Sequence, residues 1–399
     1  MKYFFRDRHF EYQVQRAVGA ASAGQADTAE VIEICRHIRS GDCGSWYREW
    51  KKAADRIREF GVQSLKKGYA VTASESFLRA ASYYRAAEFY LYGSKTEEVC
   101  EIHALATKCF NKAAEYMPAD ISAVCIPFEG TTIAAHFYRA QTKSPAPTVI
   151  AMTGNDGTKE ELYAIGTGAV ARGMHCIAFD GPGQGESYRL QGIPFRYNYE
   201  TVIKAVIDYL VHDQSVDKSR IVLWGESMGG YFAPRAAAFE KRIAACIANS
   251  GLYDCLGFSP ATLTKRSELL AFVEHHKVLF NNTVHFLMKC STSFDWRFRH
   301  GCASFGVKTP ADYFLGLKQF CLSDTVQNIK CPVLVTADEN EVKARREQPQ
   351  ILYNALSCPK TYLFFSNTEG AGSHCEQGCR LYANGRIFNW IEKTLSVLS

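Results

Sequence analysis

The chain has 399 residues, of which 47% are hydrophobic and 22% are charged, and its formal net charge is +5 at pH 7. These values are ordinary for a soluble globular protein with a sizeable buried core. The positive excess is mild and dispersed, with its densest cluster at Lys343, Arg345 and Arg346, so nucleic-acid binding is not expected. No apolar stretch is long enough to span a membrane, so no membrane association is expected either.

Cysteine usage and the N-terminal residues indicate the compartment. The 15 cysteines stand singly along the chain, and charges at Arg6, Asp7 and Arg8 interrupt the N-terminal stretch. A secretory leader needs an uninterrupted apolar region, so we expect none. The sequence therefore predicts reduced thiols in a cytoplasmic protein.

The first 118 residues are predicted to be helical. Apolar residues recur at three- and four-residue spacing between Ser45 and Arg85, and Ser74 is typical of a helix start. Four aromatic residues at helical spacing are expected mainly in the core, with pocket lining as the alternative: Tyr83, Tyr84, Phe89 and Tyr90.

From about residue 119 the pattern changes to strands. The segment ISAVCIPFEGTTIAAHFYRA alternates and contains the turn Glu129-Gly130, which predicts a β-hairpin. Short apolar runs then alternate with helical stretches, and these runs include PTVIAM, HCIAFD, RIVLW, IAACIAN, CPVLVTAD and TYLFF. Such alternation predicts βαβ units and a mostly parallel sheet.

Residues 252–325 interrupt this alternation. The stretch is rich in aromatic residues and is predicted to be a helical insertion between two strands. The predicted fold class is therefore α/β, with a helical domain at 1–118, a core formed by 119–251 and 326–399, and an inserted helical lid at 252–325.

The motif Gly225-Glu226-Ser227-Met228-Gly229 follows the strand RIVLW and precedes a helix-compatible run. This is G-x-S-x-G in a strand–turn–helix context, where a tight turn excludes side chains at the glycines and exposes the serine. Ser227 is the predicted nucleophile, and the N–H of Met228 is the predicted first oxyanion donor. A chance match in a glycine-containing turn is the alternative interpretation, and the flanking elements argue against it.

The second oxyanion donor is expected in the loop after PTVIAM. This loop reads Thr153-Gly154-Asn155-Asp156-Gly157, and its glycines let the backbone approach a substrate closely. The N–H of Asn155 is the candidate donor. The alternative is an ordinary glycine-rich turn between a strand and a helix.

The chain order serine, acid, histidine points to the remaining members of a triad. His374, in EGAGSHCEQG, is the only histidine beyond residue 300, and it is the predicted base. The acid is expected where CPVLVTADENEV ends. Spacing favours Glu341, with Asp338 as the rival and Glu339 third, and the alternative for Glu341 is a simple surface charge.

Two further signals are interpreted as structural. The turn DGPGQGES at residues 180–187 lacks the ending of a phosphate-binding loop, and a structural turn beside the active site is favoured. His374, Cys375 and Cys379 lack the partner pair of a zinc site. No metal and no cofactor are therefore predicted.

Several segments together resemble a known family, namely SWYREW, SYYRAAEFYL, GTKEELY, FDGPGQGES, GESMGGYFAPRAAAFE and EGAGSHCEQG. They are similar to the esterase FrsA-like branch of the α/β-hydrolase superfamily. That branch includes the 2,6-dihydroxypseudooxynicotine hydrolases and fungal polyketide-cluster hydrolases of the fusarin type.

The resemblance implies the α/β-hydrolase fold, a helical cap formed by residues 1–118 and a homodimer. By analogy with related C–C hydrolases, it also implies that Asp156 helps to polarise a 1,3-dicarbonyl substrate. The branch more often has Asp where Glu341 stands.

These features predict a serine hydrolase with a small-molecule substrate. The hypothesis is hydrolysis of an ester, thioester or activated carbonyl bond of a polyketide-type intermediate through an acyl-enzyme. One alternative is C–C hydrolysis of a 1,3-diketone in aromatic or heterocycle degradation. Another is a cyclisation or condensation without hydrolysis on the same fold, and a non-enzymatic binding module is the least favoured.

Overall fold

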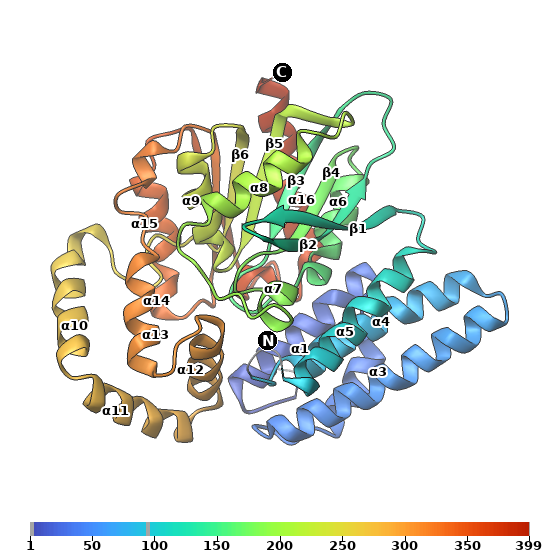
Figure 1. Cartoon of the computed structure of the whole chain (residues 1–399), viewed down its shortest axis with the longest axis horizontal. Coiled ribbons are helices and arrows are strands. Elements are labelled where there is room, and N and C mark those ends of the chain that lie inside the picture. Colours follow the sequence, from blue (N-terminus) through green and yellow to red (C-terminus); the bar gives the residue numbers. More distant parts are fainter. Residues whose placement is uncertain (1–3, 93–95, 399) are drawn as a thin grey trace.

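The computed structural model describes residues 4–92 and 96–398. The helices that precede the first strand lie side by side at one end of the molecule (Figure 1), and they are α1 Arg8–Ala20, α2 Thr28–Arg36, α3 Cys43–Lys66, α4 Ala70–Glu88 and α5 Glu97–Ala114. The helix predicted to start at Ser74 starts at Ala70 instead. Ser74 caps nothing there, because its hydroxyl donates to the carbonyl oxygen of Ala113 at 2.8 Å.

The strands form one sheet in the described part of the chain, and it has the order β1-β2-β4-β3-β5-β6-β7-β8. Their bounds are β1 Asp120–Phe128, β2 Thr131–Arg139, β3 Ala146–Met152, β4 His175–Asp180, β5 Val216–Glu226, β6 Ile243–Asn249, β7 Val333–Asp338 and β8 Lys360–Phe365. β2 pairs antiparallel with β1 and β4, and the other pairings are parallel. The predicted hairpin is confirmed, with Glu129 and Gly130 at φ 44° and 80° as its two-residue turn.

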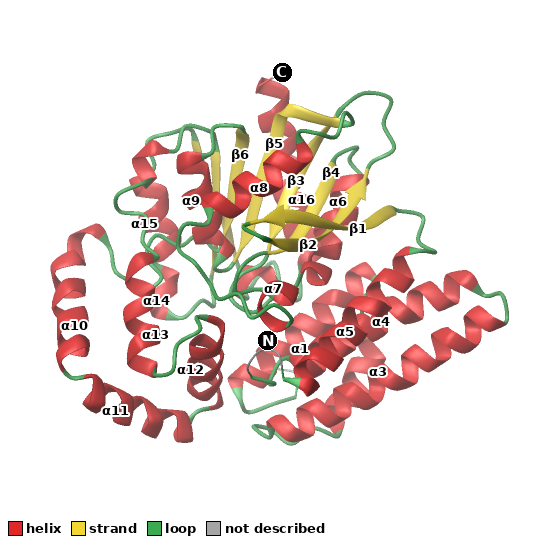
Figure 2. Cartoon of the chain, viewed as in Figure 1, coloured by secondary structure: helices red, strands yellow, loops and turns green. Residues whose placement is uncertain are grey.

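Helices cover both faces of this sheet (Figure 2). They are α6 Tyr163–Val170, α8 Glu200–Leu210, α9 Gly229–Phe239, α15 Gln348–Ala355 and α16 Arg380–Leu398. The short helices α7 Gly185–Arg189 and α14 Lys343–Arg346 lie near the end of the sheet instead (Figure 1). Side chains alternate along β5, so that Val222 and Trp224 enter one apolar core while Ile221 and Leu223 enter the other. The mostly parallel α/β sheet predicted from the sequence is confirmed.

Helices α1–α5 share their core with one face of the sheet. Trp46, Trp50 and Tyr84 belong to the same apolar cluster as Trp224 of β5 and Phe388 of α16. The four aromatic residues expected mainly in the core are buried, as predicted, although Phe89 also borders a cavity described below. Burial of these large side chains fixes the helical segment against the sheet.

The segment between β6 and β7 is helical. It lies at the same end of the sheet as the N-terminal helices, but on the other side (Figures 1 and 2). It contains α10 Leu263–His275, α11 Lys277–Cys290, α12 Thr292–Ser304 and α13 Pro310–Gly316. α12 contacts the N-terminal helical segment, because Trp296 stacks on Phe89 with ring centroids 5.0 Å apart. None of the described helices combines the length and apolar character needed to cross a membrane.

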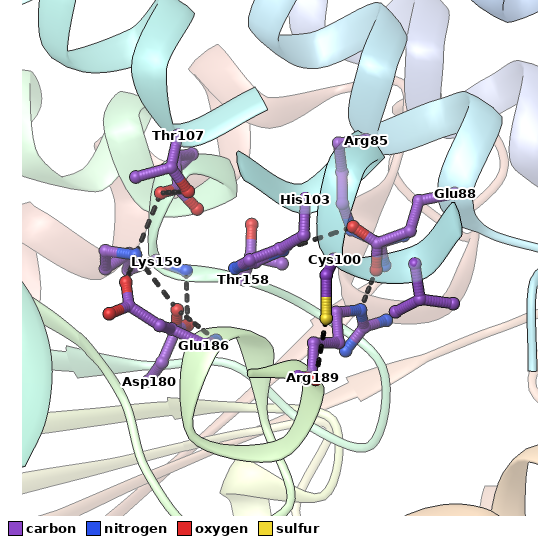
Figure 3. A network of polar contacts seen from close by, with 12 residues as sticks. Arg85, Glu88, Cys100, His103, Thr107, Thr158, Lys159, Asp180, Glu186 and Arg189 are labelled. Atoms are coloured by element: carbon purple, nitrogen blue, oxygen red, sulfur yellow. Dashed lines mark hydrogen bonds and ion pairs between the residues drawn. The ribbon is translucent and has the colours of Figure 1, made fainter. Parts of the chain in front are cut away.

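A buried network of charges joins α4 and α5 to the loops of the sheet (Figure 3). The ammonium of Lys159, which is 2% exposed, lies 3.1 Å from Asp180 and 3.0 Å from Glu160. Beside it, Glu88 of α4 forms an ion pair with Arg189 of α7. Burial acts to lower the pKa of Lys159, but the carboxylates of Asp180, Glu160 and Glu186 together outweigh burial and raise it. Lys159 therefore stays charged, and each buried charge of this network is stabilised only while its oppositely charged partner is present.

Replacing Lys159 with Met is expected to destabilise the protein by about 3–5 kcal/mol, because Asp180 would be left buried without its cation. Urea unfolding followed by circular dichroism measures the loss. Lys204→Met is the matched control, since Lys204 pairs with Asp208 at 2.6 Å on the surface, where water screens the charges. Equal, small losses in the two variants would contradict a structural role for the buried network.

Candidate active site

Ser227 occupies a sharp turn between β5 and α9. Its φ of 59° lies in the left-handed region, which is strained for a residue with a side chain. A Cβ at Gly225 would lie 2.1 Å from the carbonyl oxygen of Gly229, so glycine is required for this close approach. The N–H of Ser227 donates to the carbonyl oxygen of Asn249 at 3.0 Å and anchors the turn. This is the strand–turn–helix geometry that exposes a serine hydroxyl.

His374 reaches this turn from the segment after β8. It opens a short 3₁₀ turn in which Cys375 and Glu376 both have positive φ, at 50° and 51°. Its Nε2 lies 2.8 Å from the Oγ of Ser227, across 147 residues of sequence. Its Nδ1 forms an ion pair with the carboxylate of Glu341. The structure therefore brings Ser227, His374 and Glu341 together.

The two rival acids differ in how they reach the imidazole. Asp338, the last residue of β7, accepts hydrogen bonds from the Ser250 hydroxyl at 2.8 Å and from the Cys375 N–H at 3.1 Å. The Ser250 Oγ in turn lies 3.2 Å from His374 Nδ1. Glu341 contacts that nitrogen directly, and this contact favours Glu341 over Asp338.

Glu339, the third candidate, lies away from this group. Its carboxylate accepts a hydrogen bond from the N–H of Asn367 at 2.6 Å in an exposed loop. This leaves Glu341 and Asp338 as the carboxyls near His374.

The electrostatics of the two remaining acids also differ. Burial acts to raise the pKa of Glu341, but His374 outweighs burial and holds that pKa at about 2. Burial raises the pKa of Asp338, which is 2% exposed, above its ordinary value. Burial likewise acts to lower the pKa of His374, yet Glu341 overcomes it and raises the value above 6.5. Of the two carboxyls, Glu341 therefore favours the protonated form of the imidazole more strongly.

The loop after β3 packs directly on the serine turn. A Cβ at Gly154 would lie 2.6 Å from the Cβ of Ser227 and 2.7 Å from the N of Met228, so only glycine fits. Asn155 and Met228 border the same cavity as Ser227. Both predicted oxyanion donors are therefore residues of the site.

Asp156, in the same loop, is held by two arginines from the N-terminal helices. Its Oδ2 lies 2.5 Å from Arg16 Nη1 and 3.6 Å from Arg85 Nη2. Burial acts to raise the pKa of Asp156, but the two guanidinium groups outweigh it and hold the pKa below its ordinary value. Asp156 is therefore an ionised carboxylate whose charge is largely balanced.

A cavity of about 1160 Å³ opens over Ser227. Its walls come from α1, from the loop after β3, from α12 and α13, and from the loops that carry Glu341 and His374. The bulky apolar side chains among the lining residues include Tyr12, Phe89, Leu252, Trp296, Tyr313 and Leu317. This volume exceeds the roughly 300–1,000 Å³ typical of small-molecule sites, so an extended substrate fits.

The donor atoms of Asp338, Glu341 and His374 lie within 4.8 Å of one another, as in a metal site. Both ring nitrogens of His374, however, already face protein partners, so neither is left to bind a metal. The Sγ of Cys375 lies 3.6 Å from His374 Nε2, whereas Cys379 contacts the carbonyl oxygen of Glu369. These thiols and the imidazole do not form a tetrahedral ligand set.

Sequence reasoning missed several side chains at this site, among them Ser250, Gln184, His300 and the two arginines on Asp156. Ser250 links the two acids to His374, and its place at the end of β6 was an available signal, because carboxyl ends of parallel strands meet at one sheet edge. Gln184 and His300 contact the loop after β3. Gln184 falls in the glycine-rich turn interpreted as structural, and nothing near His300 in the sequence points to the site.

Comparisons with known proteins identify the family of the chain. The family model for esterase FrsA-like proteins matches residues 13–269. Hydrolyase poxO of Penicillium oxalicum is 31% identical, over 84% of each chain. Hydrolase acrC of Aspergillus aculeatus is 28% identical over 99% of this chain and 98% of that protein. The 20-hydroxy-prefusarin hydrolase FUS2 of Gibberella moniliformis is also 28% identical, over 98% of each.

Solved structures share the fold. The crystal structure of 2,6-dihydroxy-pseudo-oxynicotine hydrolase has a TM-score of 0.73 at 19% identity, covering 94% of this chain and 95% of that one. AbyA5 has a TM-score of 0.66 at 16% identity, covering 98% and 99%. The chain therefore belongs to the esterase FrsA-like family of α/β-hydrolases, and it is a hydrolase.

Proposed function

We propose that this hydrolase acts through Ser227 as nucleophile, His374 as general base and Glu341 as the acid that orients the imidazole. The observation that carries the proposal is the 2.8 Å contact between Ser227 Oγ and His374 Nε2, with Glu341 on the other ring nitrogen. A serine hydroxyl becomes nucleophilic when an adjacent base accepts its proton.

The reaction follows from these contacts. Ser227 Oγ attacks the substrate carbonyl while its proton moves to His374 Nε2, and Glu341 stabilises the imidazolium. The N–H groups of Met228 and Asn155 donate to the oxygen that becomes negative. The imidazolium then protonates the leaving group, and a water activated by the same histidine releases the acid from the acyl-enzyme.

The proposed substrate is an ester, thioester or activated carbonyl of a polyketide-type intermediate. The volume of the cavity and its aromatic walls support an extended, partly apolar molecule. The name of one relative, 20-hydroxy-prefusarin hydrolase, supports the same class. Because α1 and α12 both contribute to the walls, we propose that residues 1–118 act as a cap and residues 252–325 as a lid.

A second candidate is C–C hydrolysis of a 1,3-diketone with help from Asp156. The observation that favours it is the position of Asp156 in the cavity wall, ionised and backed by Arg16 and Arg85. Cyclisation would use the same acyl-enzyme, with a group of the substrate replacing water. A homodimer and a cytoplasmic location stay predictions.

Ser227→Ala is expected to lower the hydrolysis of p-nitrophenyl butyrate by at least ~10⁴-fold, because it removes the atom that forms the acyl-enzyme. Stopped-flow absorbance measures the rate, and mass spectrometry after treatment with a fluorophosphonate checks for an adduct on residue 227 in the native protein. Undiminished turnover in the variant, or an adduct elsewhere in the native protein, would refute the proposed nucleophile.

The pH profile of kcat/KM tests the acid. The base must be neutral, and Glu341 raises the pKa of His374, so activity should be lost on acidification at a higher pH than an unperturbed imidazole would give. Glu341→Gln removes the charge that favours the imidazolium, so this acid limb should move to lower pH while kcat falls by roughly 10²–10⁴-fold. Asp338→Asn keeps the Glu341 contact and should move the limb much less. The reverse ranking would assign the acid to Asp338.

Asp156→Asn separates the two candidate reactions. If Asp156 assists C–C hydrolysis, the variant should lower cleavage of 1-phenyl-1,3-butanedione at least ~10-fold more than it lowers ester hydrolysis. Glu161→Gln is the matched control, since Glu161 pairs with the same arginines, at 2.7 Å from Arg16 and 3.0 Å from Arg85. Equal losses of both activities in both variants would mean that Asp156 only holds the arginines.

A further inference from the structure

The loop after β3 is held by side chains from outside it, beginning with Gln184. The Nε2 of Gln184 donates to the carbonyl oxygen of Thr153 at 2.7 Å and to that of Gly154 at 2.8 Å. Gln184 has no solvent exposure, and its Oε1 accepts from the Tyr199 hydroxyl at 2.8 Å and the Gly181 N–H at 3.2 Å. Flipping the amide would turn its oxygen toward two carbonyls, so these partners fix its orientation.

The bond to Gly154 also fixes the direction of the neighbouring N–H. In a planar trans peptide, the C=O of Gly154 and the N–H of Asn155 point in opposite directions. Holding that carbonyl toward Gln184 therefore turns the Asn155 N–H away from Gln184. Since Gly154 packs on Ser227 and Asn155 borders the cavity, the orientation of this peptide decides whether the N–H can serve as an oxyanion donor.

The next peptide is held by the insertion. The Nε2 of His300, on α12, lies 2.8 Å from the carbonyl oxygen of Asn155. Burial lowers the pKa of His300 to about 4, so the ring is neutral and must carry its proton on Nε2 to donate to a carbonyl. The ring stacks on Trp296 at 4.8 Å, and Trp296 stacks on Phe89 of the N-terminal segment.

The next carbonyl of the loop, that of Asp156, is held by the N-terminal helices. Arg85, on α4, donates from Nη2 to the carbonyl oxygen of Asp156 at 2.5 Å. Consecutive carbonyls of one loop thus accept hydrogen bonds from the core turn, the insertion and the N-terminal helices. Preorganised donors stabilise a developing oxyanion only when their direction is set before the reaction.

We propose that Gln184 and His300 are positioning residues that fix the orientation of the two peptide groups flanking Asn155. The oxyanion hole is then complete only when the α12 helix of the insertion packs against the loop after β3. The inference rests on the proposed function, because it assumes that Ser227 is the nucleophile. It assigns Gln184 of the glycine-rich turn and His300 of the insertion a role in the chemistry, although neither side chain lines the cavity.

The experiment measures how fast a fluorophosphonate labels Ser227, because its P=O oxygen occupies the position of the substrate oxygen. Gln184→Met removes both donors at similar side-chain length, and His300→Phe removes the donor while keeping a ring on Trp296. Each variant should label at least ~10-fold more slowly than the native protein, as expected for a disturbed oxyanion donor. For p-nitrophenyl butyrate, kcat should fall more than KM rises, and the acid limb of the pH profile should stay in place.

Tyr199→Phe is the matched control, because it removes one partner of Gln184 and leaves both bonds to the loop. It should label within ~2-fold of the native rate, since the oxyanion donors are unchanged. Native labelling rates in both Gln184→Met and His300→Phe would overturn the inference, and so would a shifted acid limb. Slow labelling of Gln184→Met together with a native labelling rate in His300→Phe would overturn the role of the insertion.

If Gln184→Met does not fold, His300→Phe decides the test alone. A native protein that is not labelled at Ser227 would contradict the proposed function itself. Labelling of the native protein at Ser227, with unchanged rates in the variants, would contradict only this inference.

Discussion

The contact between Ser227 and His374 is the interaction on which the rest of the site depends, and it requires strained backbone on both sides. The non-glycine residues with positive φ in the described part of the chain are Glu129, Ser227, Ser250, Cys375 and Glu376. Apart from the hairpin residue Glu129, all of these lie at the ends of elements that carry the site. Strain of this kind persists only where surrounding structure over-determines the conformation. Here the buried sheet provides that support, through bonds such as that from the Ser227 N–H to Asn249.

The second constraint is the attachment of the N-terminal helices to the sheet. Their aromatic side chains share one apolar core with β5 and α16, and buried charges such as Lys159 and Asp180 hold the loops beneath them. This attachment places Arg16 and Arg85 against Asp156. The helices therefore both contribute to the cavity wall and contact the loop that packs on the Ser227 turn.

Much of the fold follows from local patterns in the sequence. The hairpin at Glu129-Gly130 and the parallel sheet could be predicted because alternation and turn residues act over a few positions. Ser227 could be proposed because its glycines and flanking elements are adjacent in sequence. His374 and Glu341 required only the chain order of the fold and the loop after a recognisable strand. Their contact with each other is a fact of the structure.

Other features could not be predicted because they arise from contacts between distant segments. Ser250 links Asp338 to His374 across about a third of the chain's length. Its place at the end of β6 indicates the sheet edge that carries the site, but not these two partners. His300 lies in the aromatic-rich insertion, where its bond to Asn155 depends on how α12 docks. The start of α4 was misplaced for the same reason, because Ser74 finds its partner on a different helix.

The central claim is that Ser227 and His374 work as one unit, and a double-mutant cycle on kcat tests it most directly. We would compare Ser227→Ala, His374→Ala and the double variant with the native protein on one ester. If the two groups form a single proton-transfer pair, the double variant will be no slower than the slower single variant. Losses that multiply would show that the two side chains act independently, and the account would be wrong.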